Sequence, residues 1–293
     1  MLDKNKRTQL EKIDYDGTGG ITGKAIENIG HAWARVFHNA GIDLKGKDVL
    51  EIGGGTGALT LALLQRRQVR HLVATDISAV FLAKMLDRVN GEFPVTAIRC
   101  DCNSMPTTSA SFDVVVGRSI LHHLLDYQQV LRQCARILRP GGVAIFFEPV
   151  LEGKLTVAFF GALVANLAKS EANPALSEQE VDRIRSVVRH ITKASWHPQD
   201  RESLSRLEDK YIFTIAGMQE SAKTAGFRSS EIIRDNRELD QTFWSYFVNT
   251  MRIVGIPAEK LEGYRFLSLA YQQTFGAFRD LVHEPMNYFC FRK

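Results

Sequence analysis

A glycine-rich stretch constrains the fold of this chain more than any other feature of its sequence. Residues 48–64 run DVLEIGGGTGALTLALL, in which an apolar run typical of a buried strand precedes several glycines and then leucines typical of a helix. In an α/β sheet, such a turn opens into a crevice, and the first N–H groups of the following helix point into it. The stretch therefore predicts a nucleotide site in an α/β fold.

The rest of the chain repeats this alternation of strand and helix. The first five strands are expected at Val49–Ile52, His71–Thr75, Val95–Arg99, Phe112–Val116 and Val143–Phe147. Turn signals at Asn90-Gly91 and Gly141-Gly142 support their boundaries. Two more strands are expected at Ser229–Arg234 and Asn287–Phe291. The pattern predicts a doubly wound, mostly parallel seven-stranded sheet with helical cap insertions.

The alternation stops after residue 147, which divides the chain into a sheet core and insertions. We expect an N-terminal helical lid (1–40), a nucleotide-binding core (41–150), a helical cap insertion (151–215), a continuation of the core (216–235), an aromatic-rich helical insertion (236–285) and a final core strand (286–293). A helix is expected near residues 24–39.

Composition and charge restrict where the protein is expected to be located and which partners it is expected to bind. The N-terminus carries charges where a secretory leader needs its apolar region. The longest apolar run, Leu155–Ala168, is shorter than a bilayer span and is more typical of a buried helix. The four cysteines lack paired metal-type spacing, and the net charge of +4 is small for a dedicated nucleic-acid binder. We expect a cytoplasmic, bacterial-type protein with no membrane span, no bound metal and no nucleic-acid partner.

The glycine turn is compatible with two classes of nucleotide. Gly53, Gly55 and Ala58 satisfy the G-x-G-x-x-G/A pattern of dinucleotide sites, and Asp76 lies at the distance expected of a ribose-binding acid. Glu51, however, places a carboxylate beside the helix N-terminus that would hold a pyrophosphate, and like charges repel. A ligand with a positive centre is favoured instead. An NAD-dependent oxidoreductase remains the alternative.

With Glu51 before Gly53-x-Gly55-x-Gly57, the sequence resembles the class I S-adenosylmethionine-dependent methyltransferases of the small-molecule type. Further similar segments follow in the family's order: ATDIS (74–78), IRCDCNSMP (98–106), FDVVVGRSILHHL (112–124) and RILRPGGVAIFFEP (136–149). The resemblance covers residues 45–150 well and 216–235 weakly. It implies a Rossmann-like core with an antiparallel seventh strand near residues 287–291, and S-adenosyl-L-methionine as the cofactor.

The same resemblance implies a set of cofactor-binding residues. They are Tyr15, Glu51, Gly53, Gly54, Gly55, Gly57, Asp76, Ile77, Asp101, Cys102, Arg118 and Ser119. The glycines let the backbone approach the cofactor, Asp76 holds the ribose hydroxyls, and Asp101-Cys102 contacts the adenine. Glu51 lies near the amino-acid moiety, and Tyr15 closes the site. The alternatives are a turn without a ligand, a helix N-cap at Asp76 and a packed thiol at Cys102.

Methyl transfer from a sulfonium is an in-line displacement that needs a base only when the acceptor carries a proton. His122 and His123 follow the fourth strand, where acceptors approach in the family. His123 is the first candidate for the proton, because imidazoles titrate near neutral pH. The alternative is that both histidines pack against a helix start. His197 is a further candidate, and Glu148 is expected to orient the pocket.

The insertions suggest how an acceptor is received. Arg185, Arg189 and Lys193 repeat at four-residue spacing, as in a basic stripe that receives an acidic substrate or carrier protein, or in a solvated helix face. Residues 240–282 hold nine of the 27 aromatic residues, which are expected in a core or a homodimer seam, with some lining an apolar acceptor pocket. The fourth strand lacks the Asn/Asp-Pro-Pro-aromatic turn of nucleic-acid amino-methyltransferases.

These observations predict S-adenosylmethionine-dependent methyl transfer to a small or medium organic acceptor, which is apolar or carrier-bound. The acceptor atom is expected to be oxygen. One alternative is a protein of the same fold that uses the cofactor for another reaction, such as a cyclisation, or only binds it. A non-enzymatic partner-binding protein of this fold and an NAD-dependent oxidoreductase are the others.

Overall fold

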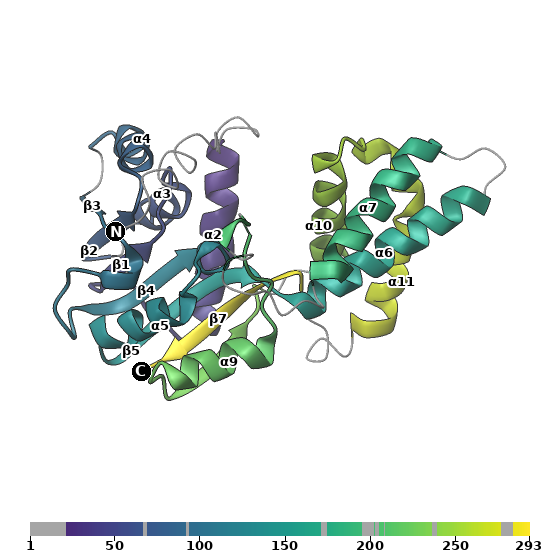
Figure 1. Ribbon diagram of the computed structural model, residues 1–293. Helices are drawn as coiled ribbons and strands as arrows, with labels where there is room; N and C mark the ends of the chain where they lie inside the picture. Colours follow the sequence, from purple (N-terminus) through teal and green to yellow (C-terminus); the bar gives the residue numbers. More distant parts are fainter. Residues whose placement is uncertain are drawn as a thin grey trace. The chain divides into compact units, whose positions relative to one another are not determined.

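The structure is a computed structural model (Figure 1) that describes residues 22–66, 69–91, 94–170, 175–194, 202, 205–207, 209–235, 239–276 and 284–293. Tyr15 and His197 lie outside these residues. The chain divides into two compact units. The sheet unit comprises the described residues of Met1–Glu148, Met218–Asp235 and Tyr288–Lys293, and the helical unit those of Pro149–Gly217 and Asn236–Asn287.

The expected seven-stranded α/β sheet is confirmed, and it is mixed. Its strands are β1 (Asp48–Ile52), β2 (His71–Asp76), β3 (Val95–Arg99), β4 (Phe112–Arg118), β5 (Leu138–Pro149), β6 (Ser229–Ile233) and β7 (Met286–Arg292). Their order is β3-β2-β1-β4-β5-β7-β6. The pairs β1–β2, β1–β4, β2–β3 and β4–β5 are parallel, whereas β6 and β7 pair antiparallel. The chain reverses its direction of winding between β1 and β4, where ligands bind in open α/β sheets.

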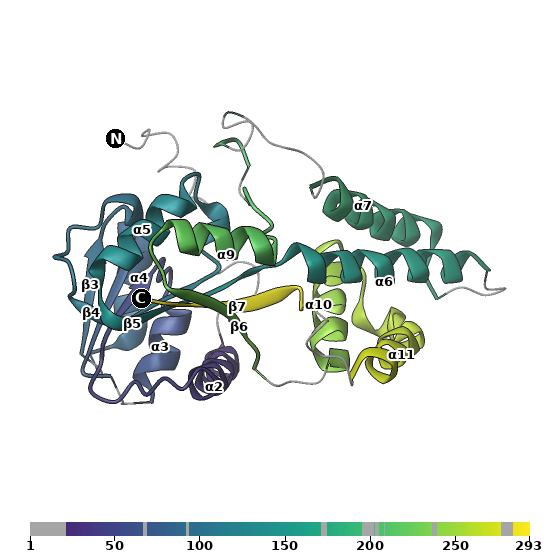
Figure 2. The same ribbon diagram turned by 90° about the horizontal axis from the view of Figure 1, so that it is seen from below.

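Helices cover both faces of the sheet. They are α2 (Gly23–Asn39), α3 (Ala58–Leu64), α4 (Ala79–Val89), α5 (Tyr127–Ile137) and α9 (Ile215–Thr224). Figure 2 shows α2 and α3 on one face and α5 and α9 on the other. In α2, Trp33 and Val36 are buried, and the Trp33 ring meets the edge of Tyr288 at 5.3 Å. Although residues 1–40 were expected to form a lid, α2 is therefore part of the sheet core.

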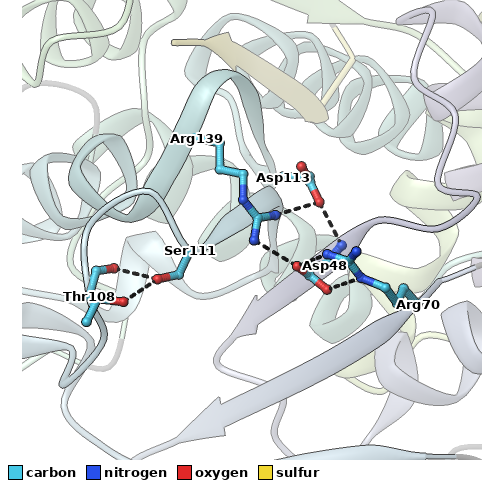
Figure 3. A network of polar contacts seen from close by, with 6 residues as sticks. All are labelled: Asp48, Arg70, Thr108, Ser111, Asp113 and Arg139. Carbon is cyan, nitrogen blue, oxygen red and sulfur yellow. Dashed lines mark hydrogen bonds and ion pairs between the residues drawn. The ribbon is translucent and has the colours of Figure 1, made fainter.

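Three ion pairs join the N-terminal ends of β1, β4 and β5 to Arg70, the residue before β2 (Figure 3). Arg139 donates from Nη2 to Asp48 Oδ2 at 2.9 Å and from Nη1 to Asp113 Oδ2 at 2.8 Å. Arg70 donates from Nε to Asp48 Oδ1 at 2.9 Å, and the Asp48 N–H donates to Asp113. The hydrogen bond from Arg70, with a smaller effect of Arg139, lowers the pKa of Asp48 to about 2 against the opposing effect of burial. The network fixes how the strands align.

The two expected insertions fold together as the helical unit. Its helices are α6 (Leu151–Ser170), α7 (Glu178–Ala194), α10 (Leu239–Ile253) and α11 (Phe266–Phe275), with the 3-10 turns η3 (Ala258–Lys260) and η4 (Glu262–Tyr264). Phe243 and Phe247 of α10 are fully buried, and the Phe243 ring packs edge-on against Phe160 and Tyr271. The expectation that aromatic residues of 240–282 form a core is thus confirmed for these rings.

The apolar run at Leu155–Ala168 lies within α6, as expected of a helix. By length and composition alone, α6 could cross a membrane: it has 20 residues, and its 18-residue window has a mean hydropathy of 1.3. The same window is 44% buried, with Val157, Phe160 and Val164 inside the core of the helical unit. Partial burial of this kind is also found in the core helix of a protein that does not span a membrane. The absence of a membrane span stays a prediction.

Candidate functional site

The glycine turn follows β1, as predicted, and each of its alternate glycines has a left-handed backbone. The φ angles are +67° at Gly53, +54° at Gly55 and +95° at Gly57. A Cβ atom would lie 2.6 Å from Ile120 at Gly53 and 2.7 Å from Met85 at Gly57, whereas at Gly55 it would enter open space. Gly53 and Gly57 are therefore required by packing, and Gly55 leaves room for a ligand.

Glu51 is a buried acid directly before this turn. It is 2% exposed, and Thr60 Oγ1 of α3 donates to its Oε2 at 2.6 Å. Burial raises the pKa of Glu51 to about 7, against the hydrogen bond from Thr60. Asp76 raises this pKa further and Arg118 lowers it. A cation near Glu51 would favour its charged form. The sequence analysis missed Thr60, whose only signal is a hydroxyl residue in the first turn of α3.

Asp76 ends β2 and holds the glycine turn in place. Its Oδ2 accepts from the Gly55 N–H at 2.9 Å, and its Oδ1 accepts from the Ser78 N–H at 2.8 Å. Ser78, not Asp76, caps α4, so the alternative of a helix N-cap at Asp76 is wrong. Burial raises the pKa of Asp76. Each carboxylate oxygen has a second lone pair, which can accept from the hydroxyls of a vicinal diol.

The turn after β3 presents a buried acceptor. Asp101 Oδ1 accepts from both the backbone N–H and the Nδ2 of Asn103, at 2.9 Å each. Asn103 Oδ1 is buried and has no hydrogen-bond partner among the described residues. Burial raises the pKa of the Cys102 thiol to about 12, so it stays protonated. Because buried acceptors are rarely left unpaired, Asn103 Oδ1 fits an amino group of a ligand. The sequence analysis did not single out this residue.

Arg118 and Ser119 lie where β4 ends. The Arg118 guanidinium stands over the Phe147 ring at 5.9 Å, and burial lowers its pKa against the opposing effects of Tyr288, Glu148 and Glu51. Ser119 has a φ of +54°, an uncommon conformation for a residue with a side chain. Strained backbone of this kind is often found at functional sites.

His122 and Glu148 form a buried pair at the ends of β4 and β5. Glu148 has no exposed surface, and its Oε2 lies 2.6 Å from His122 Nδ1. Its Oε1 accepts from the N–H groups of Ile120 and Leu121 at 2.9 and 2.8 Å. One carboxylate therefore fixes both the backbone of this turn and the orientation of the imidazole.

His123 was the first expected candidate for the base, and the Glu148 carboxylate contacts His122. Both histidines lie in the 3-10 turn η2 (Leu121–His123), ahead of α5, and their ring centroids are 4.0 Å apart. His123 is only partly buried. The pairing could not be inferred from the adjacent histidines alone, because Glu148 lies on the neighbouring strand.

The predicted residues of the sheet unit gather at one edge of the sheet. Glu51, Asp76 and Arg118 lie at the carboxyl ends of β1, β2 and β4, and Asp101-Cys102 follows β3. Ile77 follows Asp76, and its carbonyl accepts from Arg99 Nε at 3.0 Å. The N–H of Gly54 donates to the carbonyl of Thr75 at 2.9 Å.

Comparison with known proteins identifies this edge of the sheet. Residues 50–146 match the family model described as "Methyltransferase domain". They form a class I S-adenosylmethionine-dependent methyltransferase domain. Its cofactor is S-adenosylmethionine, and the comparisons do not support the NAD-dependent alternative.

Two curated proteins show similarity to this chain. A reducing polyketide synthase, Preu2 of Preussia isomera, is 26% identical over 248 residues, which cover 81% of this chain and 10% of the relative. The malonyl-[acyl-carrier protein] O-methyltransferase of Haemophilus ducreyi is 34% identical over 106 residues, which cover 34% of this chain and 41% of the relative. The chain thus spans less than half the length of either relative.

A solved structure supports the fold of the methyltransferase domain and its surroundings. The phosphoethanolamine N-methyltransferase 2 of Haemonchus contortus, in complex with S-adenosyl-L-methionine, is similar with a TM-score of 0.54 and 19% identity. The similarity covers 98% of this chain and 59% of that protein.

The residues of the methyltransferase domain fit its cofactor. The open space at Gly55 admits a ligand against the backbone, and Asp76 offers lone pairs to a ribose diol. The unpaired Asn103 Oδ1 suits the amino group of an adenine. Glu51 suits the positive charge of a sulfonium amino acid, because ionisation of its buried carboxyl is favoured by a nearby cation.

Proposed function

We propose that this protein transfers a methyl group from S-adenosylmethionine to a small or medium organic acceptor that loses a proton during the reaction. When bound, the cofactor supplies an electrophilic methyl group on a sulfonium. The buried His122–Glu148 pair carries this proposal, because transfer to an acceptor without a proton needs no base.

Three groups are proposed to hold the cofactor. Asp76 accepts hydrogen bonds from the ribose hydroxyls, and Asn103 Oδ1 accepts from the adenine amino group. Glu51 stabilises the positive end of the molecule. All three belong to segments anchored by backbone hydrogen bonds, so the cofactor is oriented before the acceptor arrives.

His122 is proposed to be the general base. The Glu148 carboxylate accepts the Nδ1–H, which leaves Nε2 as the basic nitrogen of the neutral imidazole. The proton of the acceptor passes to Nε2 as the acceptor attacks the methyl group. Glu148 then stabilises the imidazolium, which returns the proton to solvent. Glu148 also accepts hydrogen bonds from the N–H groups of Ile120 and Leu121. The imidazole of His122 is therefore already oriented before the acceptor binds, and no conformational entropy is lost in orienting it during the reaction.

Oxygen is the proposed acceptor atom. A hydroxyl gives its proton to an imidazole directly, and the Haemophilus ducreyi relative is named as an O-methyltransferase. A carbon next to a carbonyl could also lose its proton to such a base. Methylation at oxygen is distinguished from methylation at carbon by supplying the cofactor with a ¹³C-labelled methyl group and locating the label in the product by NMR.

The acceptor is proposed to be attached to a carrier. The names of both relatives support this proposal, since one acts on a malonyl-[acyl-carrier protein] and the other is a polyketide synthase. Arg189 and Lys193 are exposed on α7 and repeat at helical spacing, as suits an acidic partner surface. Arg185 of the same stripe pairs with Asp182.

The test is formation of S-adenosylhomocysteine with a panel of hydroxy and keto acids, offered free and as thioesters of an acyl carrier protein. The variant His122→Asn should reduce turnover by about 10²- to 10⁴-fold while cofactor binding is kept. His71→Asn is the matched control, because His71 is an exposed histidine on β2. Cofactor binding without S-adenosylhomocysteine from any acceptor would favour the non-methylating alternative.

A further inference from the structure

The glycine turn after β1 is hydrogen-bonded by an arginine that the sequence analysis did not single out. Arg88 lies in the last turn of α4, and its Nη1 donates to the carbonyl oxygen of Thr56 at 2.8 Å. Thr56 is buried and Arg88 is partly buried. The two residues are 32 positions apart in the chain. Helix α4 is therefore tied to the turn through a side chain that no local pattern predicts.

The peptide group between Thr56 and Gly57 is hydrogen-bonded at both of its polar atoms. Its carbonyl oxygen accepts from Arg88, and its N–H donates to the Gly54 carbonyl at 2.9 Å. Because a peptide group is planar, holding both atoms fixes the rotation of the whole plane. Gly55, where the turn leaves room for a ligand, lies between Gly54 and this plane. The plane therefore helps to set the backbone shape that meets the cofactor.

The glycines of this turn make such fixing necessary. Glycine adopts positive and negative φ about equally readily, and Gly55 and Gly57 have φ angles of +54° and +95°. The first half of the turn is anchored to β2, because the N–H groups of Gly54 and Gly55 donate to the Thr75 carbonyl and to Asp76, at 2.9 Å each. The second half needs an anchor of its own.

Helix α4 supplies that second anchor. A Cβ atom at Gly57 would lie 2.7 Å from the Met85 side chain, so the turn packs closely against α4. An apolar contact of this kind has no direction and does not fix the rotation of a peptide plane. The hydrogen bond from Arg88 to the Thr56 carbonyl has a direction and does fix it.

We propose that Arg88 is a positioning residue for S-adenosylmethionine, which acts by holding the Thr56–Gly57 peptide in the orientation that binds the cofactor. Arg88 acts through the backbone of the turn and not by touching the cofactor. The role concerns binding of the cofactor only. It is therefore independent of the base, of the acceptor atom and of any carrier.

Cofactor affinity is the first measurement. When only a fraction of the molecules has the binding conformation, the apparent Kd rises by the inverse of that fraction. Arg88→Met keeps a long side chain but has no donor for the Thr56 carbonyl. We expect the Kd of S-adenosylhomocysteine, measured by calorimetry, to rise about threefold to tenfold in this variant, as suits the loss of one hydrogen bond.

Amide hydrogen exchange of ¹⁵N-labelled protein separates this local role from a loss of overall stability. In Arg88→Met, the amide of Gly57 should exchange about fivefold faster or more, because its peptide plane is released. The amides of Gly54 and Gly55, which are anchored to β2, should change less than about twofold. A general loss of stability would instead accelerate exchange in the core strands as well, for example at Val115 of β4.

Three further variants complete the test. Arg88→Lys keeps a long donor and should bring the Kd back to within about twofold of the unchanged protein. Arg88→Gln has a shorter polar side chain, so it should behave like Arg88→Met, and it decides the question if Arg88→Met does not fold. Arg132→Met is the matched control, since Arg132 is an exposed arginine on α5 that bonds Gln129.

The proposal is overturned if Arg88→Met and Arg88→Gln bind S-adenosylhomocysteine as tightly as the unchanged protein. Exchange that is unchanged at Gly57, or that accelerates equally in the turn and in β4, would also contradict it. A Kd in Arg88→Lys as high as in Arg88→Met would exclude the hydrogen bond as the cause.

Discussion

The two ends of β1 and β4 handle charge in opposite ways. At their N-terminal ends, Asp48 and Asp113 are paired with Arg70 and Arg139 (Figure 3). At the carboxyl end of the same β1 strand, Glu51 is buried, and its carboxylate accepts from the Thr60 hydroxyl. The pKa is lowered to about 2 at Asp48 and raised to about 7 at Glu51, three positions later.

This difference separates structural charges from functional ones. Where both signs come from the protein, the pair aligns strands and nothing is left for a ligand to add. Where a charge is buried without a counter-charge, folding alone leaves it unfavourable, and a bound ligand of the right charge removes the penalty. The contrast makes the carboxyl end the part of the sheet whose stability depends most on the cofactor.

Among these variants, Asp76→Ala should have the largest effect on the affinity for the cofactor. Loss of the diol contact and of the hydrogen bond to the Gly55 N–H is expected to weaken binding of S-adenosylmethionine by about tenfold to a hundredfold, from about 1.5–3 kcal/mol for charged hydrogen bonds. Calorimetric titration measures this change. Asp113→Ala, at the other end of the sheet, is the control and should leave the affinity unchanged. Equal affinities in Asp76→Ala and the unchanged protein would remove Asp76 from the site.

Glu51 should make cofactor binding depend on pH. Burial raises its pKa to about 7, so it is neutral below that pH and becomes anionic above it. Affinity for the cationic cofactor should therefore rise by about tenfold from pH 6 to pH 8. Glu51→Gln should flatten the profile, which calorimetry at several pH values measures. A slope that persists in this variant would contradict the assignment.

The paired end should show its pH dependence in stability, and at a much lower pH than Glu51. The pKa of Asp48 is lowered to about 2, so its contribution is present above its ordinary pKa near 4 and is lost as pH falls from there toward 2. Because the pair is partly screened by solvent, Asp48→Asn should lower the free energy of unfolding by only about 1 kcal/mol at pH 7. The difference should shrink as pH falls from about 4 toward 2 in urea titrations. A constant difference would mean that packing, not charge, is lost.

The smallest expected effects are on the free energy of unfolding, when the serines at the two ends of β4 are replaced. Ser119 has a left-handed backbone, whereas Ser111 bonds Thr108 through its hydroxyl (Figure 3). Ser119→Gly should raise the free energy of unfolding by up to about 1 kcal/mol by relieving strain. Ser111→Gly should lower it by about as much, since it loses hydrogen bonds and gains chain entropy. Thermal unfolding of both variants measures the signs, and a stabilised Ser111→Gly would contradict the comparison.

Local sequence predicted the strands well because their apolar runs are short, buried and bounded by turn residues. The glycine turn and Asp76 followed from chemistry that a few adjacent residues express. The contact of His122 with Glu148 did not, because Glu148 comes from the next strand of the sheet. The unpaired Asn103 Oδ1 could not be predicted from the sequence either, because its hydrogen bonding depends on the atoms that surround it in the folded protein.

The place of α2 shows a different limit of sequence reasoning. Its helical pattern was clear, but residues 1–40 were expected to form a lid. Trp33 packs against Tyr288 of β7, more than two hundred residues later in the chain, and this contact could not be read from either segment alone.

The strand order also has a consequence for synthesis on the ribosome. Strand β6 joins the rest of the sheet only through β7, which is made after it and lies between β5 and β6. Until residues 286–292 emerge, the β5 edge has no strand to its outer side and β6 has no partner at all. An open edge of this kind can pair with other chains. The nascent protein must therefore keep the open edge of β5 from pairing with other chains while the residues between β5 and β7 are translated.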